Sequence, residues 1–172
     1  ADLDRQYPAA RRRADEEIYK LLGLLEPGDD LRELSRSLFG EGVAGYYDPR
    51  DGRLRVVEGA GTGTRVLEEM VLAHELTHAL EDQRFGLPTQ PAATDDRELA
   101  RVALYEGSAP SLMYSYVREH FSVEEALGGL LASVFEDTGE LPPFLQAQLL
   151  FGYVGGGRFV AERVREAREP VL

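Results

Sequence analysis

Two histidines four residues apart, with a glutamate directly after the first, are the residues whose types and spacing could do chemistry in this chain. They are His74 and His78, and the glutamate is Glu75. Each residue of an α-helix turns the chain by about 100°, so residues four apart lie on one face and both imidazoles can point at one ion. This spacing is typical of zinc ligands. The segment therefore predicts a hydrolytic zinc site, with His74 and His78 as ligands and Glu75 as the catalytic base.

The residues around this segment predict the helix that the geometry requires. Residues 64–84 contain neither Gly nor Pro, and Gly86 and Pro88 follow them as terminators. Apolar residues continue at helical spacing into the two histidines: Val66, Leu67, Met70 and Val71. The alternative is a buried helix whose histidines only satisfy hydrogen bonds. The glutamate between two histidines at ligand spacing favours a metal site.

A catalytic zinc site usually has a third protein ligand and one open position. The chain contains no Cys, so the third ligand must be His, Asp or Glu. Glu106 lies among apolar residues in a predicted helix over residues 95–121, where a buried carboxylate needs a partner such as zinc. The remaining histidine, His120, lies about 20 Å further along a straight helix and is expected at the surface. We expect Glu106 to be the ligand; a glutamate on a solvated helix face is the alternative.

The composition bounds the class of protein. The 172 residues suffice for one domain, and 43% hydrophobic and 29% charged residues are ordinary for a globular chain. The net charge of −12 argues against a nucleic-acid partner. No apolar run approaches the roughly 20 residues of a membrane helix. The chain starts at Ala1 without an initiator Met, so we expect a processed or excised domain, and its compartment and oligomeric state stay open.

The predicted elements give a mostly helical α+β fold with a small sheet before the histidine-bearing helix. We expect one domain over residues 1–172. Its parts are a helical lead-in over 9–39, a hairpin over 43–58, zinc-site helices over 64–84 and 95–121, and C-terminal helices over 122–168.

Local signals set the expected ends of these elements. The first helix should run from Ala9 to Leu25 and break at Pro27, and Asp30 should cap the next. Residues 48–52 have turn chemistry, with Pro early and Asp-Gly at the end.

The later helices carry their own signals. Pro110 predicts a kink or break near Ser108. Ser122 and Glu125 form a capping box, and Pro142 and Pro143 should start a further helix. The glycines at 155–157 should separate that helix from a last one over 158–168.

The pattern resembles the gluzincin zinc metallopeptidases, most of all their minimal, single-domain bacterial type. These enzymes carry His-Glu-x-x-His on one helix and a glutamate ligand on a later one, and His74, Glu75, His78 and Glu106 match that pattern. The resemblance covers roughly residues 43–116. It implies a zincin-like fold, a zinc cofactor, and a peptide or protein substrate. It also implies that a segment after Ser122 could lie in the cleft and hold the protein latent.

The chain departs from the gluzincin pattern after the ligand glutamate. Relatives often place an acidic residue there to orient a ligand histidine, whereas this chain has Ser108 and Pro110. We expect Asp82, one turn beyond His78, to take that role.

The chemistry of such a site predicts the mechanism. Zinc would lower the pKa of a water molecule, and Glu75 would take its proton and pass it to the leaving amine. A further donor normally stabilises the oxyanion. The candidates for this donor are Tyr46, Tyr47, Tyr114 and Tyr153. Two other functions stay open: a zinc-binding domain that recognises or regulates a partner without hydrolysis, and a helical domain with no metal.

Overall fold

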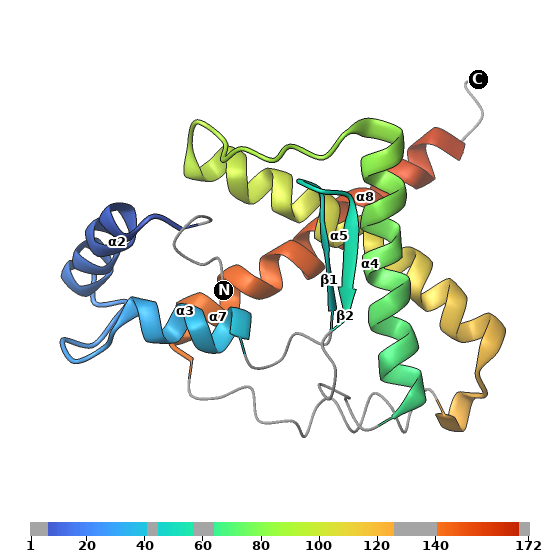
Figure 1. The fold of residues 1–172 in the computed structure, drawn as a ribbon, viewed down its shortest axis with the longest axis horizontal. Coiled ribbons are helices and arrows are strands. Elements are labelled where there is room, and N and C mark those ends of the chain that lie inside the picture. Colours follow the sequence, from blue (N-terminus) through green and yellow to red (C-terminus); the bar gives the residue numbers. More distant parts are fainter. Residues whose placement is uncertain (1–6, 41–44, 57–63, 126–140, 169–172) are drawn as a thin grey trace. The chain divides into compact units, whose positions relative to one another are not determined.

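The computed structural model describes residues 7–40, 45–56, 64–125 and 141–168, without the side chains of 37–40 and 168. It is mostly helical with one two-stranded antiparallel sheet, which confirms the predicted α+β class (Figure 1). The elements are α2 (Ala9–Leu21), α3 (Leu31–Gly40), β1 (Gly45–Asp48), β2 (Arg53–Val56), α4 (Arg65–Phe85), α5 (Asp95–His120), α7 (Pro143–Leu150), η1 (Phe151–Gly155) and α8 (Gly156–Arg168). None of the described helices is long and apolar enough to span a membrane.

The described residues form two compact units. One contains residues 7–40 and 141–148, and the other contains residues 45–125, apart from the undescribed segment 57–63, and residues 149–168. The prediction of a single domain stays a prediction. The histidine segment and Glu106 both belong to the second unit.

The first unit has its own apolar core. Leu25, Leu31 and Leu145 are buried at its centre, and four partly buried side chains pack around them: Tyr7, Tyr19, Leu34 and Phe144. Asp30 caps α3 as predicted, because its Oδ1 accepts from the backbone N–H groups of Arg32 at 2.7 Å and Glu33 at 3.2 Å.

Helix α2 ends at Leu21, so the predicted extension to Leu25 is wrong. Gly23 adopts a φ of +69°, a left-handed conformation that glycine reaches without a steric penalty. This residue turns the chain before Pro27 and brings Leu25 into the core. Leu25 continued the apolar pattern of the helix in the sequence because it is also buried, although it lies in the turn that follows α2.

The hairpin pairs β1 with β2 in the register Gly45↔Val56 to Asp48↔Arg53. The turn between the strands closes through a hydrogen bond from the Gly52 N–H to the Asp48 carbonyl at 2.9 Å, with Gly52 at a φ of +66°. The hairpin and its turn chemistry are confirmed. Positions 43, 44, 57 and 58 of the predicted hairpin lie outside the described residues.

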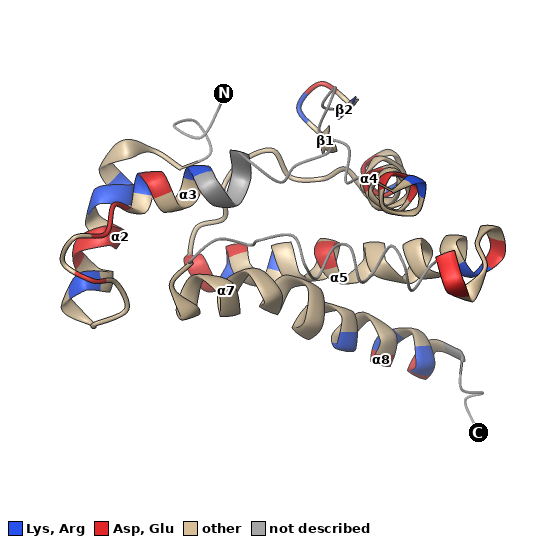
Figure 2. Cartoon of the chain, turned by 90° about the horizontal axis from the view of Figure 1, so that it is seen from below, with Lys and Arg blue, Asp and Glu red and all other residues tan. Residues whose placement is uncertain are grey.

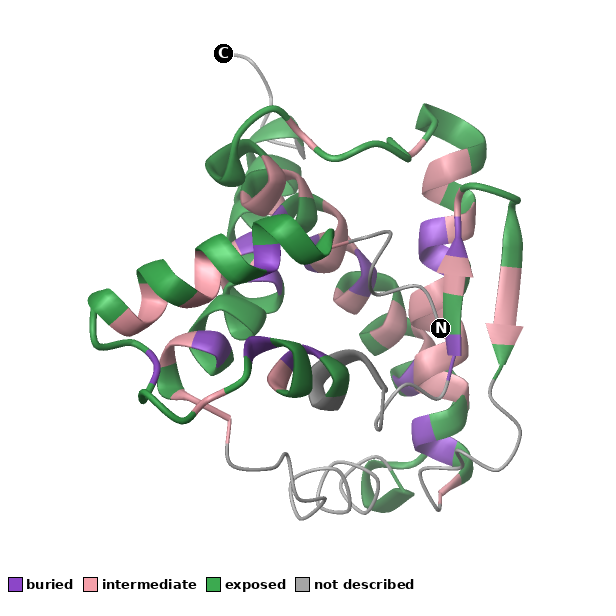
Figure 3. Cartoon of the chain, turned by 60° about the vertical axis from the view of Figure 1, so that its left-hand side comes forward, coloured by how far each residue is buried: buried purple, intermediate pink, exposed green. Residues whose placement is uncertain are grey.

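Helix α4 carries the two histidines and agrees with the prediction to one residue at each end. The Thr64 hydroxyl accepts from the backbone N–H of Leu67 at 3.4 Å, which caps the first turn. Gly86 ends the helix with a φ of +72° and donates to the carbonyl of Asp82 at 2.8 Å. Exposed positions dominate the last turn, near Phe85 (Figure 3).

Helix α5 continues through Pro110, so of the predicted kink or break near Ser108 the break is wrong, and the kink stays a prediction. Proline removes the hydrogen bond that its own N–H would make to the carbonyl of Glu106, and its ring crowds that carbonyl. Helix α5 nevertheless continues, because it packs against α4, η1 and α8, which support it. The capping box is confirmed, because Ser122 and Glu125 exchange hydrogen bonds of 2.8 and 3.2 Å. Residues 126–140 of the predicted C-terminal helices lie outside the described residues.

The glycines at 155–157 do not separate two helices, contrary to the prediction. The π-helical turn η1 passes directly into α8 at Gly156. A Cβ on Gly156 would lie 1.8 Å from the carbonyl oxygen of Ala103, and one on Gly107 would lie 2.1 Å from the carbonyl carbon of Gly156. The glycines serve helix packing instead, because only residues without a Cβ let the backbones of α5 and α8 approach this closely.

Candidate metal centre

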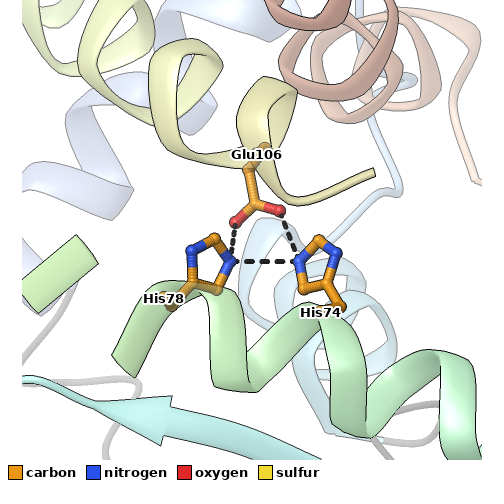
Figure 4. A group of neighbouring side chains, drawn as sticks. All are labelled: His74, His78 and Glu106. Carbon is orange, nitrogen blue, oxygen red and sulfur yellow. Dashed lines mark hydrogen bonds and ion pairs between the residues drawn. The ribbon is translucent and has the colours of Figure 1, made fainter. Parts of the chain in front are cut away.

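Three side chains from two helices converge on one point. His74 and His78 project from α4, and Glu106 projects from α5 (Figure 4). Nε2 of His74 lies 3.2 Å from Oε2 of Glu106 and 3.0 Å from Nε2 of His78. Nε2 of His78 lies 3.9 Å from Oε1 of Glu106. One ligand atom from each residue therefore lies within 4.8 Å of the others, so the group could hold a metal ion.

The convergence follows from how the helices cross. The rings of His74 and His78 lie edge to face, with centroids 4.7 Å apart, because their four-residue spacing places them on one side of α4. Helix α4 runs across α5 at a steep angle (Figure 2), and side chains of α4 contact the stretch of α5 from Glu106 to Tyr116. Glu106 lies in that stretch, backed by Gly152 of η1, where a Cβ would lie 3.4 Å from the Cβ of Glu106.

The donor set fits a bound cation. Two imidazole nitrogens and one carboxylate oxygen are ligands that divalent transition metals accept, and the three side chains are only 12%, 11% and 27% exposed. Two facing imidazole nitrogens can share one hydrogen as a donor and an acceptor, and a bound metal ion would instead take the lone pair of each nitrogen. The donor set alone does not identify the metal.

The charges of the group are mutually dependent. Burial by itself would raise the pKa of Glu106, but the hydrogen bond to His74 and the proximity of His78 lower it. Burial by itself would lower the pKa of His78, but the hydrogen bond to Glu81 and the charge of Glu106 raise it. Both pKa shifts favour a protonated imidazole next to an ionised carboxylate. A bound cation would supply the positive charge in place of the imidazole proton.

Glu75 lies beside the group and is held by the hairpin. The backbone N–H of Tyr47 on β1 donates to Oε2 of Glu75 at 2.8 Å. Glu75 makes no other hydrogen bond among the described residues. Burial raises the pKa of Glu75, and this N–H and the neighbouring histidines oppose that rise. The hairpin before the histidine helix thus has a direct role in the site, since it orients the predicted catalytic carboxylate.

Glu81, and not Asp82 as expected, is the acidic residue that lies next to His78. Asp82 instead accepts the Tyr47 hydroxyl at 2.7 Å and the backbone N–H of Leu87 at 2.7 Å, so it links the hairpin to the end of α4. Oε2 of Glu81 lies 3.2 Å from Nδ1 of His78. The signal in the sequence was the three-residue spacing between His78 and Glu81, which places both residues on one helix face.

Ser108 is the second residue that sequence reasoning missed. It occupies a position where an acidic residue was expected, and its hydroxyl donates a short hydrogen bond to Oε1 of Glu81. The carboxylate near His78 therefore comes from α4, and the serine on α5 binds it. No pattern within either helix could reveal this contact, because 27 residues separate the two side chains.

The four tyrosines differ in their positions. Tyr153 hydrogen-bonds Glu106, and its ring centroid lies 6.0 Å from that of His74. The hydroxyl of Tyr47 is bound to Asp82, and the ring of Tyr46 lies under the guanidinium of Arg55. The residue Tyr114 is 64% exposed. Only Tyr153 among these four contacts a residue of the ligand group.

The electrostatics of Tyr153 reflect its surroundings. Burial raises the pKa of its hydroxyl, and the carboxylate of Glu106 raises it further, so the hydroxyl stays protonated and can donate. Tyr153 lies in η1, so a segment after Ser122 does reach the ligand group.

His120 does not belong to the group. Its ring packs on Tyr116, with centroids 4.4 Å apart, near the end of α5. Glu106 is therefore the third member of the cluster among the described residues.

No protein-family model, curated protein or solved structure matches this chain. The geometry of the site consequently carries the functional argument alone.

Proposed function

We propose that this chain is a zinc-dependent metallopeptidase of the gluzincin kind. The observation that carries the proposal is the convergence of His74, His78 and Glu106 within 4.8 Å, with Glu75 on the helix that bears the two histidines. Two histidines and one carboxylate are a ligand set of catalytic zinc sites, which keep a further position open. A purely structural zinc site usually has four protein ligands and needs no glutamate beside it.

Zinc accepts this donor set of two imidazole nitrogens and one carboxylate oxygen, and the chain contains no cysteine that could add a sulfur ligand. Bound by His74, His78 and Glu106, zinc would supply Lewis acidity, which polarises a peptide carbonyl and makes water more acidic. Magnesium and calcium prefer sites built from oxygen ligands, which two imidazoles and one carboxylate do not supply. Iron is the other metal that accepts two histidines and one carboxylate, and metal analysis separates the two.

Glu75 would act as general base and then as general acid. It accepts a proton from the water whose oxygen adds to the peptide carbonyl carbon, and it returns this proton to the amine nitrogen when the C–N bond breaks. The Tyr47 N–H holds one carboxylate oxygen at 2.8 Å, which leaves the other to take the proton. The products are a carboxylic acid and an amine, and Glu75 ends in its starting state.

The first test is the metal content of the purified chain and of two variants. We expect about one zinc per chain in the wild type. Glu106→Ala should lose or weaken the metal. Glu119→Ala removes an exposed carboxylate from the same helix and should retain it. Absence of any metal after incubation with zinc at neutral pH, or iron in its place, would contradict the proposal.

The second test separates hydrolysis from metal binding alone. Glu75→Gln should keep the zinc and lose cleavage of a denatured protein substrate, while Glu68→Gln, an exposed change on the same helix, should keep both. Cleavage by the Glu75→Gln variant would exclude Glu75 as the base. Zinc binding without cleavage by the wild type would favour the non-hydrolytic domain.

A further inference from the structure

The two ring nitrogens of His78 have different partners. Nε2 faces the ligand group, 3.0 Å from Nε2 of His74 and 3.9 Å from Oε1 of Glu106. Nδ1 lies 3.2 Å from Oε2 of Glu81. A neutral imidazole has one N–H and one lone pair, and a carboxylate only accepts. The hydrogen therefore belongs on Nδ1, which leaves the lone pair of Nε2 for an ion.

Glu81 is bound at both of its oxygens, by one residue from each helix. Its Oε2 faces His78 on α4, and its Oε1 accepts from the hydroxyl of Ser108 on α5. That hydroxyl also lies 2.8 Å from the carbonyl oxygen of Tyr105. A hydroxyl has a single hydrogen, and the carboxylate is the stronger acceptor, so Ser108 donates to Glu81. The Glu81 side chain is only 17% exposed, which limits competition from water.

We propose that Glu81 and Ser108 are positioning residues of the metal centre: Glu81 orients the ring of His78, and Ser108 holds Glu81 in place. A carboxylate on the non-ligating nitrogen of a histidine fixes the ring and strengthens its other nitrogen as a ligand. The pair also ties α4 to α5 next to the three ligands. The inference rests on the metal site of the proposed function, but not on peptide hydrolysis.

His74 provides an internal comparison. Among the described residues no carboxylate forms a hydrogen bond or ion pair with Nδ1 of His74. Its side chain makes contacts through Nε2 and through its ring instead. The effect of removing Glu81 should therefore be confined to the ring of His78.

The first experiment measures zinc affinity by competition with a chromogenic chelator. Glu81→Ala should bind zinc about 10–100-fold more weakly than the wild type. Glu81→Gln should lose less, because its amide oxygen still accepts the Nδ1 hydrogen, and Ser108→Ala should also lose less. The double variant Glu81→Ala/Ser108→Ala should match Glu81→Ala, since Ser108 acts through Glu81. Glu68→Ala removes an exposed carboxylate from α4 and should bind zinc as the wild type does.

The second experiment reads the tautomer of His78 by histidine-selective ¹⁵N NMR of the metal-free protein, at a pH where the rings are neutral. The wild type should carry the hydrogen of His78 on Nδ1. Glu81→Ala should shift His78 towards a mixture of tautomers, with the signals of His120 unchanged. A residue that only stabilised the fold would not change which nitrogen carries the hydrogen.

The outcomes separate this inference from the proposed function. Zinc affinity within about twofold of the wild type in Glu81→Ala, or an unchanged His78 tautomer, overturns the positioning role alone. A further loss in the double variant overturns the link through Ser108. A wild type that binds no zinc overturns both the positioning role and the proposed function. If Glu81→Ala does not fold, Glu81→Gln and Ser108→Ala carry the same tests.

Discussion

Gly156 lies in backbone contact with Ala103: a Cβ on Gly156 would be 1.8 Å from the carbonyl oxygen of Ala103. Ala103 precedes Glu106 by three residues, and Gly156 follows Tyr153 by three. The contact therefore sets the separation between α5 and the segment that brings Tyr153 to the candidate metal centre.

Gly156→Ala should destabilise the second unit. The added methyl group has no space, and overpacking of this kind costs about 1–3 kcal/mol. Gly157→Ala is the matched control, since its Cβ would meet nothing closer than 3.8 Å and alanine is the better helix former. Urea unfolding of both variants measures the difference. Equal or higher stability of Gly156→Ala would mean that α5 and α8 can separate without cost.

Zinc should stabilise the folded chain through binding. A ligand that binds only the folded state, present at 100 times its Kd, adds about 2.7 kcal/mol. We therefore expect the Tm to rise with added zinc and to fall back on chelation. His74→Ala should lose this response, whereas His120→Ala, which removes the histidine outside the group, should keep it. A response that survives the loss of His74 would place the bound metal elsewhere.

Tyr153→Phe should weaken the metal-free fold by about 1 kcal/mol, because the partly buried carboxylate of Glu106 loses a hydrogen-bond donor. Tyr114→Phe removes an exposed hydroxyl and should have no measurable effect. Urea unfolding after chelation gives the comparison. If the two variants are equally stable, the hydroxyl of Tyr153 contributes nothing to the orientation of Glu106.

Asp48 should make the stability of the folded chain depend on pH. Hydrogen bonds from Arg50, at 2.8 Å to each carboxylate oxygen, hold the pKa of Asp48 below its usual 3.8, although burial opposes them. A pKa lower in the folded state gives stabilisation that is present above 3.8 and disappears as the pH falls through the folded-state value.

Asp48→Asn tests this dependence. Near neutral pH it should unfold more easily than the wild type by on the order of 1 kcal/mol, and the difference should shrink below pH 3.8. Glu119→Gln, at an exposed position, serves as the control for general charge effects. A difference that stays constant with pH would show that the asparagine disturbs the turn for another reason.

The sequence by itself determined the local elements of this protein. Capping residues, glycine terminators and helical spacing located α4 almost to the residue, and Asp-Gly marked the hairpin turn. These signals are readable because each acts within a few residues of the chain. The four-residue spacing of His74 and His78 belongs to this class. Glu106 was also predicted, because a carboxylate among apolar residues needs a partner.

The tertiary structure decided which distant side chains meet. Glu81 and Ser108 come together across 27 residues, and Tyr47 reaches Glu75 across 28. It also made Gly156, one of the three glycines expected to break the helix, a close contact between α5 and α8, and it kept α5 continuous through Pro110. These outcomes depend on how helices cross and how closely their backbones approach, which no periodicity along a single segment records.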